Sequence, residues 1–355
     1  MFRTPLRSLS TAARKTLKIG LIPADGIGRE VIPAAKQAIE ALGSDIPRPE
    51  FIDLLAGWET FTKTGNALPH ETVDVLRNEC DCALFGSVSS PSKKVVGYSS
   101  PIVALRKELD LYANVRPVLS VAPEAGQQPA VDLIVVRENT ECLYVKQEEQ
   151  TIGENGKEAR ATRVITERAS RRIGQMAFEL ALARPRKHLT IIHKSNVLSI
   201  TDGLFRETVR KVPTLEGLNG KYDDVTIMEQ LVDSAVYRVF DVMVAPNLYG
   251  DILSDAAAAL VGSLGLVPSI NAGDSFVMGE PVHGSAPDIV GKGIANPLAS
   301  IRSAALMLRH LGYTKGADRL DLAVDQVIRE GVTLTPDLKG TSSTTEVLNA
   351  VLKRI

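Results

Sequence analysis

Residues 17–42 read LKIGLIPADGIGREVIPAAKQAIEAL, and this stretch predicts a buried strand, a glycine-containing turn and an amphipathic helix. The run Leu17–Pro23 is apolar without alternation, as in a strand that is covered on both faces. Across Glu30–Leu42 the apolar residues recur three and four positions apart, which places them on one helical face. A strand, a turn and a helix in this order are typical of an α/β fold.

The same patterns recur along the chain. Apolar runs predict five further buried strands, at Phe51–Leu55, Cys82–Val88, Leu133–Arg137, Leu189–His193 and Val242–Pro246. Helices are predicted at Glu167–Ala183 and at Pro297–Leu311, the latter with Asn296 as its N-cap and Pro297 at its first position. The alternation of strands and helices predicts an α/β fold for the whole chain.

Length and composition restrict the class of protein. The chain has 355 residues, which predicts about two domains, and prolines cluster around Val115–Pro123, where we expect a boundary. Its 41 basic and 42 acidic residues nearly cancel, which argues against a protein that binds nucleic acid or a membrane by bulk charge. No apolar run is long enough for a transmembrane helix. Three cysteines predict free thiols in a reducing compartment rather than a disulfide framework.

Residues 1–16 differ from the rest of the chain. They carry four basic residues and several hydroxyl residues, and no acidic residue precedes Asp25. Their apolar residues fall on one helical face, a pattern typical of a mitochondrial transit segment. We therefore expect the mitochondrial matrix, with a frayed basic terminus and a cytoplasmic protein as the alternative. The polar stretch Gln147–Arg160 predicts an exposed hairpin or arm.

The turn after the first strand resembles a dinucleotide fingerprint only in part. It reads ADGIGREV over residues 24–31, so Gly26 and Gly28 are present, but Val31 stands where the third glycine is required. A lone G-x-G is weak evidence for a Rossmann site, and we reject that interpretation.

Charged residues suggest two binding functions. Asp251 and Asp255 lie four positions apart, so a helix places both carboxylates on one face, where Mg²⁺ or Mn²⁺ would relieve their repulsion. The alternative is a solvated helix start. Arg106, Arg116 and Arg137 stand near the ends of predicted elements, and arginines that converge bind polycarboxylic acids well. Solvated surface arginines are the alternative.

Two further segments carry candidate chemistry. Lys194 directly follows a buried strand, where burial can turn a lysine into a general base, although surface lysines are far more common. The loop GEPVHGSAPDI over residues 279–289 is rich in small residues, which lets backbone amides approach a phosphate or an adenine closely.

Together and in order, these segments resemble the β-decarboxylating dehydrogenases, the family of the isocitrate, 3-isopropylmalate and homoisocitrate dehydrogenases. The resemblance rests on ADGIGREV, LRKELDLYANVRPV, VVRENTECLYV, HKSNVL, VDSAVYR, APNLYGDILSDAAAALVGSLG and HGSAPDIVGKGIANP. One departure is Ala24, where the family usually has glycine. The resemblance implies a two-domain, non-Rossmann α/β fold with an interdomain active site. It implies a large, mainly NAD-binding domain at 17–117 plus 268–355, and a small domain for dimerisation, metal and substrate at 118–267.

The resemblance also implies roles for individual residues. The catalytic residues are Tyr144 and Lys194. The substrate-binding residues are Ser100, Arg106, Arg116, Arg137, Tyr144, Lys194 and Asn196. The metal ligands, for Mg²⁺ or Mn²⁺, are Asp233, Asp251 and Asp255. The cofactor-binding residues are Asn196, Glu280, His283, Gly284, Ser285, Ala286, Asp288 and Asn296. In this family Lys194 and Asp233 serve the neighbouring subunit, so the resemblance implies at least a homodimer.

Cofactor and substrate follow from shorter segments. Asp288 stands where NAD-using relatives have a ribose-binding aspartate, and its charge would repel the 2′-phosphate of NADP. We therefore expect NAD. The run YSSPIVALR over residues 98–106 is similar to that of fungal mitochondrial homoisocitrate dehydrogenases. It predicts homoisocitrate as substrate and a place in lysine biosynthesis, with isocitrate and 3-isopropylmalate as alternatives.

The sequence leaves two interpretations from other classes of protein open. Non-catalytic regulatory subunits resemble the catalytic chains of mitochondrial isocitrate dehydrogenases, although this chain retains Tyr144, Lys194 and all three aspartates. A ligand-binding or scaffold protein on the same fold is the other, because a fold does not determine a function.

Overall fold

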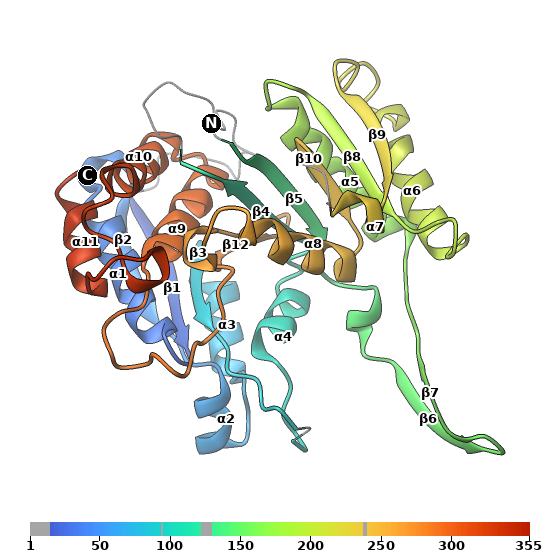
Figure 1. Ribbon diagram of the computed structural model, residues 1–355, viewed down its shortest axis with the longest axis horizontal. Coiled ribbons are helices and arrows are strands. Elements are labelled where there is room, and N and C mark those ends of the chain that lie inside the picture. Colours follow the sequence, from blue (N-terminus) through green and yellow to red (C-terminus); the bar gives the residue numbers. More distant parts are fainter. Residues whose placement is uncertain (1–14, 94, 122–129, 237–239) are drawn as a thin grey trace. The chain divides into compact units, whose positions relative to one another are not determined.

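The computed structural model describes residues 15–93, 95–121, 130–236 and 240–355, so nearly all of the predicted transit segment lies outside the described residues. The chain divides into two compact units, and each of them is α/β (Figure 1). We call Tyr112–Val115 with Leu133–Ala257 the hairpin unit. We call residues 15–111, 116–132 and 258–355 the terminal unit, because it holds the C-terminus.

The terminal unit contains a mixed sheet. Its strands are β1 (Thr16–Ala24), β2 (Arg48–Asp53), β3 (Cys82–Ser87), β11 (Ile270–Ala272) and β12 (Val277–Gly279). β1 pairs in parallel with β2 and β3, β3 pairs in parallel with β12, and β12 pairs antiparallel with β11. All six residues of β3 are buried, as expected for a parallel strand covered on both faces. β4 (Ala113–Leu119) contributes residues to both units.

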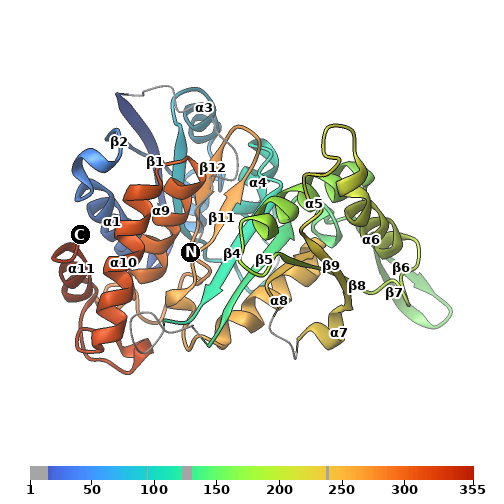
Figure 2. The same cartoon turned by 90° about the horizontal axis from the view of Figure 1, so that it is seen from above.

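Helices cover this sheet in layers. The unit contains α1 (Gly28–Glu40), α2 (Trp58–Thr64), α3 (His70–Asn78), α4 (Pro101–Glu108), α9 (Leu298–His310), α10 (Thr314–Glu330) and α11 (Thr344–Leu352). α1 packs on β1 and β3, and α9 packs on β12 beside α1. α10 and α11 lie outside these two helices, as the red ribbons of Figure 2 show. Every residue of α9 is therefore buried.

The hairpin unit contains a parallel sheet in the order β5-β10-β8-β9. Its strands are β5 (Asp132–Glu138), β8 (His188–His193), β9 (Thr226–Leu231) and β10 (Val242–Ala245), and its helices are α5 (Glu167–Leu182), α6 (Thr201–Lys211), α7 (Val232–Ala235) and α8 (Asn247–Ala259). α5 packs on β8 and β10, and α6 packs beside α5. The hairpin of β6 (Glu148–Gly153) and β7 (Gly156–Ala161) extends away from this sheet with every residue exposed, so the predicted arm is confirmed.

Most predicted elements are confirmed within one or two residues at each end. The strand predicted at Phe51–Leu55 is wrong in position, because β2 ends at Asp53. β2 follows the register of β1, which pairs Thr16 with Arg48 and Leu21 with Asp53. Leu54 is buried after the strand has ended, so its apolar character reflects packing rather than strand structure.

The start of α9 shows the predicted cap. The Asn296 side-chain oxygen accepts a hydrogen bond from the Leu298 N–H at 3.0 Å, and the helix is assigned from Leu298. Pro297 therefore precedes the first helical residue by one position, within the usual spread of such boundaries.

The three cysteines are free thiols, and burial raises the pKa of Cys80 to about 11. In the part of the chain that the structure describes, no helix has the length and hydropathy that a membrane span requires.

Candidate active site

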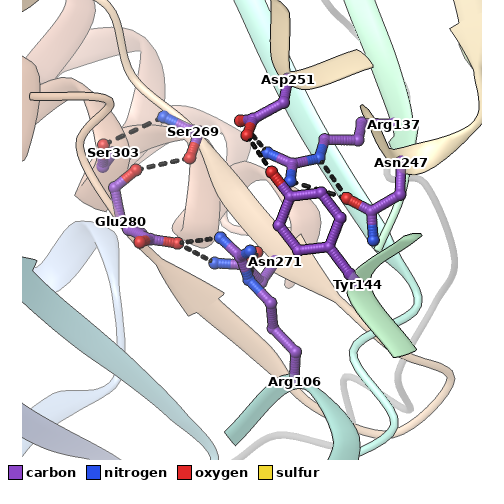
Figure 3. Close-up of polar contacts among 9 residues, drawn as sticks. All are labelled: Arg106, Arg137, Tyr144, Asn247, Asp251, Ser269, Asn271, Glu280 and Ser303. Carbon is purple, nitrogen blue, oxygen red and sulfur yellow. Dashed lines mark hydrogen bonds and ion pairs between the residues drawn. The ribbon is translucent and has the colours of Figure 1, made fainter. Parts of the chain in front are cut away.

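Arg137 organises a polar cluster in the hairpin unit, at the end of β5 (Figure 3). Its side chain is almost fully buried, and its Nε and Nη2 donate to the Asn247 side-chain oxygen at 2.9 and 2.7 Å. Its Nη1 forms an ion pair with Asp251, which also accepts a hydrogen bond from the Tyr144 hydroxyl. The guanidinium lies 5.0 Å from the centre of the Tyr144 ring. α8 approaches Arg137 closely because Gly250 has no Cβ, which would lie 2.6 Å from the arginine side chain.

Asp251 and Asp255 lie one turn apart on α8, as predicted. The side chain of Asp251 is 31% exposed and Asp255 is exposed, so hard oxygen ligands on one helix remain accessible to a divalent cation. Within the described residues, no group of three His, Cys, Asp or Glu residues gathers into a metal site. The three predicted ligands are thus not brought together in one chain.

Asp233 has a different partner. It lies on α7 and accepts a hydrogen bond from the Lys194 amine at 2.6 Å, which holds the pKa of the Asp233 carboxyl below its usual value. The side chains of Lys194 and Asp233 are 27% and 61% exposed. Lys194 and Asp233 therefore form a pair of their own, separate from the contacts that Asp251 makes with Arg137 and Tyr144.

Lys194 is held through its backbone at the end of β8. Its N–H donates to the Asp202 carboxylate at 2.6 Å, and Asp202 is completely buried in the first turn of α6. The other oxygen of Asp202 lies 2.8 Å from Arg163, whose Nη1 donates to the Tyr249 hydroxyl at 2.8 Å. Burial raises the pKa of Tyr249. This chain of contacts connects the lysine segment with α8, two residues before Asp251.

Arg106 organises a second cluster, in the terminal unit (Figure 3). From α4, its Nε donates to the Asn271 side-chain oxygen at 3.1 Å and its Nη2 pairs with Glu280 at 3.0 Å. Asn271 also donates to Glu280 at 2.5 Å. The Ser269 hydroxyl donates to the Glu280 backbone oxygen at 2.6 Å, while the Ser269 N–H donates to the Ser303 hydroxyl. A residue predicted for substrate is thus in contact with one predicted for the cofactor.

The other predicted substrate residues occupy separate positions. Arg116 is buried in β4. Ser100 is the half-buried N-cap residue of α4, where its side chain makes no capping hydrogen bond. Asn196 is exposed in the segment between β8 and α6.

The loop with the predicted cofactor residues rests on the glycine turn. The Ile27 N–H donates to the Ser285 carbonyl at 3.0 Å, and a Cβ on Gly26, whose φ is +58°, would overlap that carbonyl. Gly26 is therefore required for this packing. Gly284 and Asp288 are exposed and Ala286 is half-buried, with a φ of +40°. These positions leave loop atoms free to contact a ligand.

A cavity of about 230 Å³ lies beside this loop. The His283 Nε2 atom is buried in its wall and has no hydrogen-bond partner, and burial lowers the pKa of His283. A neutral imidazole with an unpartnered nitrogen suits a bound polar ligand. The Asn296 amide donates to Asp337 at 2.9 Å at the same cavity. The remaining walls include Ile27, Ser263, Gly265, Ile289, Ile294 and Pro336.

Sequence patterns missed several residues of these clusters. Asn247, Asn271, Asp202, Arg163 and Asp337 have no spacing signal that separates them from ordinary surface residues. Three of them, Asn247, Asn271 and Asp202, are completely buried. For these three the one available hint was the apolar character of the neighbouring residues, because a polar residue within an apolar element requires a partner.

Comparisons with known proteins show which proteins this chain is similar to in sequence and in structure. The family model for isocitrate/isopropylmalate dehydrogenase matches residues 18–351. The isocitrate/homoisocitrate dehydrogenase of Thermus thermophilus is 48% identical over 344 residues, or 95% of this chain and 98% of that protein. The 3-isopropylmalate/3-methylmalate dehydrogenase of Methanocaldococcus jannaschii is 46% identical over 95% of this chain and 98% of that protein. The structure of isocitrate dehydrogenase from Methylococcus capsulatus superposes with a TM-score of 0.86 at 39% identity, over 95% of this chain and 99% of that one.

Proposed function

Since the chain belongs to the isocitrate/isopropylmalate dehydrogenase family of β-decarboxylating dehydrogenases, we propose that it oxidises and decarboxylates homoisocitrate to 2-oxoadipate with NAD. The reaction belongs to the α-aminoadipate route of lysine biosynthesis and depends on Mg²⁺ or Mn²⁺. The observation that carries the proposal is the Arg137 cluster, where a buried guanidinium, the Tyr144 hydroxyl and Asp251 are in contact.

The side chains perform distinct parts of the reaction. Arg106, Arg116 and Arg137 hold the carboxylates of the substrate, since guanidinium groups form paired hydrogen bonds with them. The Lys194 amine accepts the proton of the substrate hydroxyl, and the Tyr144 hydroxyl donates a proton to carbon after CO₂ leaves. In the loaded enzyme, the hydride acceptor would be NAD, and the positive charge that stabilises the developing enolate oxygen would come from the divalent metal.

The metal site is shared between two copies of the chain. Asp251 and Asp255 supply ligands from one copy and Asp233 from the other, which is consistent with the absence of a three-carboxylate group among the described residues of one chain. Exposed apolar side chains in the hairpin unit, Val197, Ile200 and Ile252, support a homodimer through this unit. A higher oligomer is compatible with the same contacts.

The cofactor is NAD, held by the loop after β12 and the adjoining cavity. Its contacts come from Glu280, His283, Gly284, Ser285, Ala286, Asp288, Asn296 and, from the lysine segment, Asn196. The exposed Asp288 carboxylate repels the 2′-phosphate of NADP and accepts hydrogen bonds from the ribose hydroxyls of NAD. In domain terms, 17–117 with 268–355 is mainly the cofactor domain, and 118–267 is the dimerisation and metal domain.

Homoisocitrate is favoured by the segment before Arg106, where Ser100 offers a hydroxyl that a hydrocarbon group would leave unpaired. The alternatives are isocitrate and 3-isopropylmalate, which the names of the two relatives above include. One methylene changes binding by only about 1–3 kcal/mol, so some turnover of isocitrate is expected.

Residues 1–16 direct the protein to the mitochondrial matrix, a proposal that rests on their basic, acid-free composition. Fusion of these residues to a fluorescent protein tests it. Fluorescence that stays in the cytoplasm favours the alternative location.

The function is tested with purified full-length protein, NAD, Mg²⁺ and each of the three acids, by following the absorbance of NADH. The largest kcat/KM with homoisocitrate supports the proposal, whereas a larger value with isocitrate or 3-isopropylmalate replaces the substrate. Lys194→Met is expected to abolish turnover while NAD still binds. A folded dimer that is inactive with all three acids supports the non-catalytic subunit instead.

A further inference from the structure

Three aromatic side chains of the terminal unit, Trp58, Phe61 and Tyr98, form a cluster between α2 and the residues that precede α4. The rings of Trp58 and Phe61, one turn apart on α2, stack with their centroids 5.5 Å apart. The Tyr98 ring meets both of them edge-on, at centroid distances of 5.1 and 5.2 Å. Edge-to-face pairs have a preferred geometry, so the two rings of α2 orient the ring of Tyr98.

Hydrogen bonds hold the surroundings of this aromatic cluster. The Tyr98 hydroxyl donates to the Ser89 backbone oxygen at 3.2 Å, and burial raises the pKa of Tyr98, so the hydroxyl keeps its proton at neutral pH. The buried Asp25 carboxylate accepts from the Ser89 N–H at 3.0 Å and from the Trp58 N–H at 2.7 Å. One carboxylate therefore holds both the start of α2 and the residue to which Tyr98 is bonded.

Ser100 follows Tyr98 by two residues, at the start of α4. It is the half-buried N-cap residue of that helix, but its side chain makes no capping hydrogen bond, which is the usual use of a serine hydroxyl at this position. The hydroxyl can therefore bind another partner. Two residues of chain span at most about 7 Å, so the position of the Tyr98 ring restricts the position of this hydroxyl.

We propose that Trp58, Phe61 and Tyr98 are positioning residues that place the Ser100 hydroxyl and thereby determine which acid is preferred. None of the three has to touch the acid. A hydroxyl in a fixed place favours an acid that hydrogen-bonds to it and disfavours an acid that presents a hydrocarbon group, which leaves the hydroxyl without a partner. The inference rests on the proposed function, which supplies the acid and assigns Ser100 to it.

Steady-state kinetics of Phe61→Leu with homoisocitrate and with 3-isopropylmalate tests the inference. Leucine keeps an apolar side chain on α2 but removes both ring contacts of Phe61. The ratio of the two kcat/KM values, homoisocitrate over 3-isopropylmalate, should fall about fivefold or more, mainly through a higher KM for homoisocitrate. The matched control is Phe51→Leu, a half-buried phenylalanine of β2 outside the aromatic cluster, which should keep the ratio.

A second measurement needs no substitution, because Trp58 is the only tryptophan of the chain and its fluorescence reports on the aromatic cluster. Homoisocitrate and Mg²⁺ are added without NAD, so that no turnover occurs, and calorimetry establishes that the acid is bound. Bound acid restrains Ser100 and, through it, the Tyr98 ring. Acrylamide should therefore quench the fluorescence of Trp58 less strongly when the acid is bound.

Two results would overturn the inference. One is an equal loss of kcat/KM with both acids in Phe61→Leu, which indicates a purely structural role for the aromatic cluster. The other is quenching of Trp58 that bound acid does not change, and this result decides the matter even if Phe61→Leu does not fold. In both cases the proposed function stands, because the natural chain still turns over the acid. A natural chain that turns over none of the three acids overturns the proposed function, and this inference with it.

Discussion

Arg137 in the hairpin unit and Arg106 in the terminal unit each donate through Nε to an asparagine oxygen and through a terminal nitrogen to a carboxylate. The carboxylates differ. Asp251 also accepts from the Tyr144 hydroxyl and lies on the helix of the proposed metal ligands. Glu280 accepts instead from Asn271, the asparagine that holds its own arginine. The comparison indicates that asparagine fixes each guanidinium while the carboxylate neutralises its charge. In our proposal, the metal competes for this carboxylate only in the Arg137 cluster.

The largest expected effect is on kcat/KM, and it should differ between lysine substitutions of Arg137 and Arg106. Arg137→Lys should lower kcat/KM by about a hundredfold or more, because an ammonium cannot bind Asn247 and Asp251 with the fork geometry of a guanidinium. Arg106→Lys should cost about tenfold, since Glu280 and Asn271 remain bonded to each other. Steady-state kinetics with the preferred acid measures both. Arg210→Lys, an exposed arginine paired with Glu229, is the control and should change little. Equal losses for Arg137 and Arg106 would contradict the comparison.

The asparagines should behave alike. Asn247→Ala and Asn271→Ala each remove a buried acceptor from an arginine Nε, and both residues are completely buried. Each change should lower the free energy of unfolding by about 1–3 kcal/mol. Urea unfolding followed by circular dichroism measures this loss. If only one variant were destabilised, the two asparagines would not share a structural role.

Two buried groups, one in each unit, should contribute to stability with opposite dependence on pH. Burial raises the pKa of Glu141, in the hairpin unit, to about 6, so the folded protein binds the proton more tightly than the unfolded chain. Its contribution to stability is therefore present below about pH 4.5 and is lost as pH rises toward 6. Burial lowers the pKa of His310, in α9, to about 4. Its contribution is present above about pH 6.5 and is lost as pH falls toward 4.

Variants separate these two contributions. Between pH 4.5 and 6, Glu141→Gln should remove a fall in stability with rising pH, and His310→Gln should remove a rise. Urea unfolding at intervals across this range measures each slope against that of the natural chain. Parallel slopes for all three proteins would show that neither group titrates as described.

The smallest expected effect concerns the backbone beneath the cofactor loop. Ala24 has a φ of +55°, a conformation that favours glycine, at the position where the resemblance predicted glycine. Ala24→Gly should raise the free energy of unfolding by about 0.5 kcal/mol. The matched control is Ala35→Gly inside α1, which should lower it by about 1 kcal/mol or more. Destabilisation by Ala24→Gly would mean that the alanine conformation carries no strain.

The sequence by itself determined the α/β class and the family, because continuous apolar runs mark parallel strands and the ordered motifs extend over nearly the whole chain. It also placed Asp251 and Asp255 on one helix, since their spacing is local. Only the tertiary structure decided that Arg137 binds Asn247, 110 positions away, and that Arg106 binds Glu280, 174 positions away. Such contacts depend on how strands and helices pack, and the spacing of residues along the chain does not determine that packing. The position of β2 depended on packing in the same way, because its register with β1 outweighed its own apolar pattern.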